Sequence, residues 1–225
     1  CTEGWDTCRA EARAACGSDH LLAGFMGTGI FEQCHFLMGF EDTLTNLYAH
    51  PDEMHALIDY IMEYRLTYVR MLIDHLQPDV IFSHDDWGTK NALFMKPEMW
   101  REFFKEPYRR FYGYIRSRGV IAIHHADSYL VPIVDDMAEI GIQVWQGVLP
   151  ENDIPALQAH LNGRLTLMGG FGAAIDRKDA TPEDILTYAR GVLRRNCPGG
   201  HYIPSITYGL AGTVYPHVDT YLNQA

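Results

Sequence analysis

Residues 120–124 of this 225-residue chain have the sequence VIAIH. They form a short apolar run directly after a long helical pattern, which begins at residues 96–98 (KPE) and ends near Gly119. Such a run is typical of a strand that is buried on both faces, as strands in parallel sheets are. Similar runs predict five further strands, at residues 21–25, 79–83, 143–147, 165–169 and 202–206.

Helical patterns separate these strands along the chain. One helix is predicted to begin at residues 51–53 (PDE), where proline and two acids suit a first turn. Another is predicted to begin at Thr181, an N-cap residue followed by Pro182. It is predicted to end at Arg194 and Arg195, whose positive charges interact favourably with the carboxyl end of the helix dipole. This alternation predicts an α/β protein with a parallel sheet and right-handed crossovers.

The six predicted strands fit two architectures. One is a TIM-type (β/α)8 barrel, of which residues 1–225 form a single domain with about six βα units and the first strands precede Cys1. The other is an open, doubly wound sheet. No stretch of the sequence resembles a linker between domains.

Composition and charge narrow the classes of function. With 47% hydrophobic residues, the chain has enough apolar side chains for a sizeable core. Its net charge of -11 argues against a nucleic-acid partner, and no apolar run has the roughly 18 residues that a membrane span requires. The five cysteines include no C-x-x-C pair, so we expect a reduced, cytoplasmic protein.

Two polar clusters follow neighbouring predicted strands. Residues 83–86 (SHDD) follow the strand at 79–83, and residues 124–128 (HHADS) follow the strand at 120–124. In a parallel barrel, catalytic groups gather just past the carboxyl ends of the strands. We therefore expect five residues to line the barrel mouth as catalytic groups: His84, Asp86, His124, His125 and Asp127.

Two kinds of chemistry suit this set. Imidazole nitrogens and carboxylate oxygens bind zinc, and the candidate metal ligands are His84, His124, His125 and Asp127. Alternatively, histidine and aspartate act as general acid and base without a metal. The sequence leaves both open.

Beyond these residues, the chain resembles the uroporphyrinogen decarboxylase superfamily. The resembling segments keep their order along nearly the whole chain. They are residues 24–27 (GFMG), 86–88 (DWG) with 96–100 (KPEMW), the strand ending in His124, residues 133–141 with the strand that follows, 168–170 (MGG) and 181–183 (TPE). The resemblance implies an eight-stranded barrel.

The superfamily contains decarboxylases of uroporphyrinogen and corrinoid-dependent methyltransferases, some of which bind zinc through a His-x-Cys motif. The resemblance matches that histidine to His124, whereas Ala126 and Tyr208 stand at the cysteine positions, so the thiolate set is incomplete. The resemblance implies that the decarboxylases use a tyrosine and a serine after two of their strands. These two positions fall near His35 and His84 in this chain. The residues expected to contact the substrate are Phe25, His35, Trp87, Trp145 and Tyr208.

The resemblance favours a methyltransferase that moves a methyl group from a small substrate, such as a methoxylated aromatic compound, to a corrinoid. The expected partners are that substrate, a corrinoid protein and a second copy of the chain in a homodimer. Two alternatives remain: a tetrapyrrole carboxy-lyase of porphyrin biosynthesis, and a non-catalytic barrel that binds a corrinoid or tetrapyrrole. Zinc content distinguishes the methyltransferase from both.

Overall fold

The computed structural model describes residues 4–206 and 214–225. Six strands form one sheet in which every neighbouring pair is parallel. The strands are β1 (Ala23–Met26), β2 (Val80–His84), β3 (Ile121–His125), β4 (Val144–Val148), β5 (Thr166–Phe171) and β6 (Tyr202–Ile206). They overlap all six runs predicted from the sequence.

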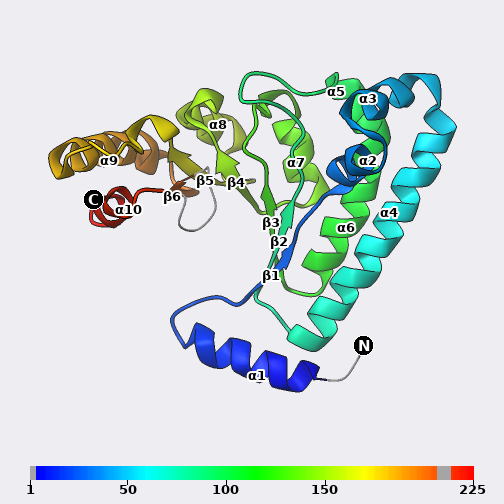
Figure 1. The fold of residues 1–225 in the computed structure, drawn as a ribbon, viewed down its shortest axis with the longest axis horizontal. Coiled ribbons are helices and arrows are strands. Elements are labelled where there is room, and N and C mark those ends of the chain that lie inside the picture. Colours follow the sequence, from blue (N-terminus) through cyan, green and yellow to red (C-terminus); the bar gives the residue numbers. More distant parts are fainter. Residues whose placement is uncertain (1–3, 207–213) are drawn as a thin grey trace.

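The strand order is that of a barrel. It runs from β1 to β6 without a reversal, whereas a doubly wound sheet changes direction where its second half begins. The alternative of an open, doubly wound sheet is therefore wrong. The described part of the chain is six consecutive strands of a TIM-type barrel, with β1 and β6 at the two edges of the sheet (Figure 1).

Helices connect the strands and cover the convex side of the sheet (Figure 1). The α-helices are α1 (Trp5–Cys16), α2 (Ile30–Met38), α3 (Phe40–Ala49), α4 (Pro51–Met71), α5 (Pro97–Trp100), α6 (Glu106–Ser117), α7 (Val134–Ile140), α8 (Ile154–Leu161), α9 (Pro182–Asn196) and α10 (Pro216–Leu222). The predicted helix starts at 51–53, 96–98 and 181–182 are confirmed. In α9, Thr181 and Asp184 form a reciprocal capping box.

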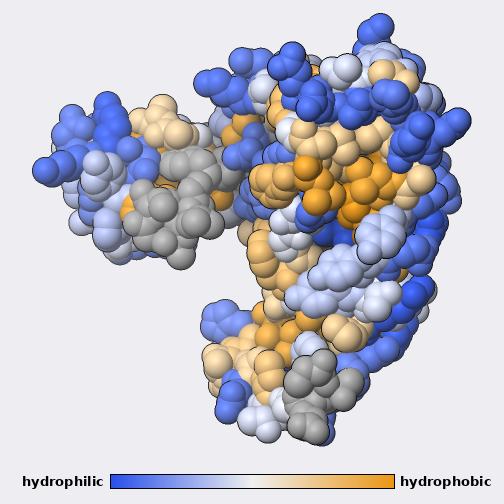
Figure 2. Space-filling model, turned by 45° about the vertical axis from the view of Figure 1, so that its right-hand side comes forward, coloured by the Kyte–Doolittle hydropathy of each residue, from blue (hydrophilic) through white to orange (hydrophobic). Residues whose placement is uncertain are grey.

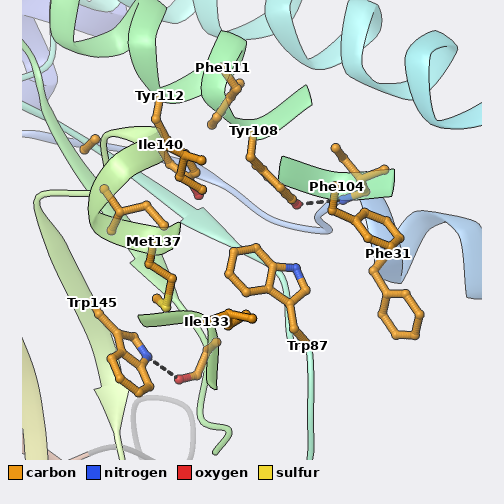
Figure 3. Close-up of a cluster of buried hydrophobic side chains, with 14 of the residues drawn as sticks. Phe31, Trp87, Phe104, Tyr108, Phe111, Tyr112, Ile133, Met137, Ile140 and Trp145 are labelled. Atoms are coloured by element: carbon orange, nitrogen blue, oxygen red, sulfur yellow. Dashed lines mark hydrogen bonds between the residues drawn. The ribbon is translucent and has the colours of Figure 1, made fainter. Parts of the chain in front are cut away.

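Between the sheet and these helices lies an aromatic core, drawn in Figure 3. Trp87 packs edge-on against Trp100 and lies beside Tyr108, with ring centroids 4.9 and 5.3 Å away. Trp145 donates its indole N–H to the carbonyl oxygen of Ala126 over 2.9 Å (Figure 3). These side chains are fully buried, so the helical aromatic pattern after residue 100 belongs to the core.

The opposite face of the sheet is concave and more accessible. Successive side chains of a strand point to opposite faces, and the burial pattern of β3 alternates accordingly. Phe25 is 62% exposed, and Ile203 on β6 is 42% exposed. Figure 2 shows apolar side chains exposed on the hollowed side of the molecule. No described helix is long and apolar enough to cross a membrane.

Candidate active site

The pleat of β3 separates its two histidines. His124 is completely buried among the helices, whereas His125 is half-buried on the concave face. In β2 the same alternation buries Ser83 and turns His84 to the concave face, where its register partner is His125. The structure therefore places the inward groups of the two strands next to one another.

His84, Asp86 and His125 form a compact cluster at the carboxyl ends of β2 and β3. Their potential ligand atoms all lie within 4.8 Å of one another. The two imidazole rings stack nearly parallel, with centroids 4.4 Å apart. These three residues were predicted to share the mouth of the barrel, and the geometry brings them together.

Asp86 is held by the loop that follows β3. Its Oδ1 accepts a hydrogen bond from the backbone N–H of Asp127 at 3.0 Å and a longer one from Ser128 Oγ at 3.5 Å. Among the described residues, no donor bonds Oδ2, so this oxygen is available to a ligand. Burial raises the pKa of Asp86 against the opposing effect of the two nearby histidines.

Asp127 lies close enough to this cluster to interact with it electrostatically. Burial, followed by the charge of Asp86, raises the pKa of the Asp127 carboxyl, while His125 and His84 lower it. Its side chain is not one of the three groups whose ligand atoms converge. Asp127 is two residues after the inward His125, in the loop that follows β3.

His124 has a different environment. Its ring stacks on Trp87 with centroids 4.1 Å apart, and its Nδ1 lies 2.6 Å from the hydroxyl of Tyr112. Burial, with smaller contributions from nearby cations, lowers its pKa well below the usual value, so the imidazole is neutral. His124 was expected to be a metal ligand. It lies in the core instead, because its side chain points from β3 toward the helices.

The structure adds Glu32 to the cluster, a residue that the sequence did not single out. Glu32 Oε2 lies 3.0 Å from His84 Nδ1 and accepts a hydrogen bond from the N–H of Gly29 at 3.0 Å. Burial acts to raise the pKa of Glu32, but these two contacts outweigh it and lower the pKa. The hydrogen bond to Glu32 raises the pKa of His84 against the effect of burial.

Asp85 fixes the start of α2 and thereby the position of Glu32. Its carboxylate accepts the backbone N–H groups of Phe31 at 3.1 Å and Glu32 at 3.0 Å, which are unpaired donors of the first helical turn. Trp87 Nε1 and the Tyr108 hydroxyl donate to the same carboxylate. Burial raises the pKa of Asp85 to about 6.

Gly29, which precedes α2, allows the Asp85 side chain to come close to the start of this helix. A Cβ atom on Gly29 would lie 2.0 Å from Cβ of Asp85, well inside van der Waals contact. Arg65, which is buried on α4, donates hydrogen bonds to the carbonyl oxygens of Gly27 and Thr28 and to Ser83 Oγ. The loop between β1 and α2 is therefore anchored from both sides.

The residues expected to contact the substrate lie in different places. Phe25 is exposed on the concave face, with its ring 5.9 Å from that of Phe82. His35 lies on α2 in an aromatic group with Phe31 and Phe40. Tyr208 lies outside the described residues. Trp87 and Trp145 are fully buried in the core, so their rings do not line the accessible face.

Comparisons with known proteins agree with this architecture. The family model described as uroporphyrinogen decarboxylase (URO-D) matches residues 6–220. The structure is similar to that of a methyltransferase from Methanosarcina mazei, with a TM-score of 0.77 and 19% sequence identity over 99% of this chain. The chain spans 62% of that protein's length. No curated protein sequence matches it.

Proposed function

The chain belongs to the uroporphyrinogen decarboxylase family, and we propose that it is a methyltransferase that transfers a methyl group from a small substrate to a corrinoid on a partner protein. One observation carries the proposal: His84, Asp86 and His125 converge on the concave face at the carboxyl ends of their strands. A methoxylated aromatic compound is the substrate class that we propose.

The converging residues fit a divalent metal. Two imidazoles and a carboxylate are a ligand set that zinc accepts, and three protein ligands leave a fourth position open, as in catalytic zinc sites. Asp86 retains an oxygen for this role because its other oxygen is occupied by the loop. We propose that His84, Asp86 and His125 would bind zinc, with Asp127 nearby in the loop after β3.

Demethylation of an ether breaks the bond between the methyl carbon and oxygen, and the electron pair remains on the oxygen. Zinc would act as a Lewis acid at that oxygen, and the reduced corrinoid would supply the nucleophile that takes the methyl group. The protein's part is to place the ether at the cluster and to stabilise the developing phenolate or alkoxide. We propose that Asp127, which lies near the cluster in the loop after β3, supplies the proton to that oxygen.

Charge at the site favours this reaction over the decarboxylation of uroporphyrinogen. Glu32, Asp86 and Asp127 surround the two histidines. A substrate with many carboxylates would be repelled by these groups. By contrast, a neutral aromatic ring suits Phe82, whose ring lies beside His125, and the exposed Phe25, whose ring lies beside Phe82.

We also propose a cytoplasmic, homodimeric protein. The cysteines of the described residues (Cys8, Cys16, Cys34 and Cys197) are all free, which suits a reducing compartment. The corrinoid is proposed to arrive on a separate protein, which would dock at the carboxyl ends of the strands, because that is where the cluster is accessible.

A methyl-transfer assay tests the proposed reaction. The protein is incubated with zinc, a reduced corrinoid and a panel of methoxylated aromatic compounds, and methylation of the corrinoid is followed by absorption. We expect transfer from at least one member of the panel and no decarboxylation of uroporphyrinogen in a parallel assay. Turnover of uroporphyrinogen without methylation of the corrinoid would assign the chain to the carboxy-lyases. Corrinoid binding without either reaction would indicate a non-catalytic barrel.

A further inference from the structure

Both inward histidines are held by a hydrogen-bond acceptor on the same ring nitrogen. Glu32 Oε2 lies 3.0 Å from His84 Nδ1. Gln146 Oε1, on the neighbouring strand β4, contacts His125 Nδ1 in the same way. A carboxylate accepts hydrogen bonds and cannot donate them, so the proton of a neutral His84 must lie on Nδ1. The same follows for His125 while the amide oxygen of Gln146 faces it.

We infer that Glu32 and Gln146 are positioning residues that hold His84 and His125 as Nδ1–H tautomers, with Nε2 of each ring free for the metal. This inference rests on the proposed metal site and deepens it. A histidine that binds a metal through one nitrogen is commonly oriented by an acceptor on the other.

The hydrogen bonds around Glu32 fix the position of its side chain. Asp85 binds the N–H groups of the first turn of α2, including that of Glu32 itself. Gly29 donates to Glu32 Oε2 and allows the close approach of Asp85. The carboxylate is only 12% exposed at the side chain, so water does not replace it easily as the partner of His84.

Gln146 holds His125 independently of Glu32. It lies on a strand, far along the chain from α2, and its backbone pairs with His125 in the register of β3 and β4. The side chains of register partners on one face of a sheet lie side by side. A substitution at Gln146 therefore alters the surroundings of His125 without disturbing α2.

The test compares the wild-type protein with Glu32→Leu, Glu32→Gln and Gln146→Leu. Glu41→Leu, at an exposed glutamate of the next helix, is the matched control. Long-range ¹H–¹⁵N spectra of the metal-free proteins report which nitrogen of each histidine carries the proton. Competition with a chromophoric chelator measures the dissociation constant for zinc.

We expect Nδ1–H tautomers at His84 and His125 in the wild-type protein. Glu32→Leu should lose the tautomer at His84 only, Gln146→Leu should lose it at His125 only, and each should weaken zinc binding by about 10- to 100-fold. Glu32→Gln keeps a neutral acceptor and should retain the tautomer and most of the affinity. A purely structural role of Glu32 would leave the His84 tautomer unchanged in Glu32→Leu.

The outcomes separate the two proposals. Nε2–H tautomers in the wild-type protein, or unchanged zinc affinity in both leucine variants, would overturn the positioning roles while leaving the metal site intact. Absence of stoichiometric zinc binding by the wild-type protein would overturn the metal site itself. In that case the spectra still decide whether Glu32 and Gln146 fix the tautomers.

Discussion

Replacing His125 with alanine should lower the rate of methyl transfer by about a hundredfold or more and abolish stoichiometric zinc binding. The change removes one of three converging ligand atoms and a group that would stabilise the developing oxyanion. Rates are measured with the reduced corrinoid and the best substrate of the methoxylated panel, and zinc by elemental analysis. His50→Ala, at an exposed histidine, is the control and should retain both properties.

Substitution of the neighbouring His124 tests which of the two histidines of β3 binds zinc. His124→Ala removes a ring that stacks on Trp87 and contacts Tyr112, so it should lower the free energy of unfolding and leave zinc bound. A protein that loses zinc with His124→Ala and keeps it with His125→Ala would contradict the assignment of the inward side chain.

The second large effect concerns stability. Trp87→Ala should lower the free energy of unfolding by about 3–5 kcal/mol, because it leaves a cavity among Trp100, Tyr108 and His124 and removes a hydrogen bond to buried Asp85. Trp87→Phe refills most of that volume and should cost about 1–2 kcal/mol, chiefly for the lost donor to a charged acceptor. Denaturant titration monitored by circular dichroism measures both.

The exposed Tyr60 of α4, at 77% exposure, is the control for this series. Tyr60→Ala should change the free energy of unfolding by no more than about 0.5 kcal/mol. If Trp87→Ala costs no more than Tyr60→Ala, the ring of Trp87 is not part of the packed core. A Trp87→Phe protein that folds normally but has a strongly raised KM would instead favour contact with the substrate.

The fold could be predicted because each strand and helix carries a local signal. Apolar runs alternate with helical patterns, and helix starts such as Thr181-Pro182 are specified by neighbouring residues. The choice between barrel and doubly wound sheet was not available from those signals, since both contain the same units. The resemblance to the uroporphyrinogen decarboxylase superfamily predicted the barrel, and the observed strand order confirms it.

The candidate site was predicted in part. His84, Asp86 and His125 come together because they follow neighbouring parallel strands. Their position after two consecutive strands carried that signal. The sequence could not say whether His124 or His125 faces inward, because a strand buried on both faces has no clear polar side. Trp87 and Trp145, which were expected to contact the substrate, are fully buried in the core.

Glu32 was missed because it reaches His84 across 52 positions of sequence, from a helix on another βα unit. No local spacing connects the two residues. Gln146 did offer a signal: it lies inside a predicted apolar strand, where a polar side chain requires a partner. Its neighbour His125 is that partner.

His84, Asp86 and His125 are proposed to bind a metal through imidazole nitrogen and carboxylate oxygen. X-ray absorption at the zinc edge of the reconstituted protein tests this proposal directly. We expect one zinc per chain, with imidazole nitrogen and carboxylate oxygen ligands at about 2.0–2.2 Å. A sulfur shell at about 2.3 Å, or an ordered zinc signal that persists unchanged in a His84→Ala, His125→Ala double variant, would contradict it.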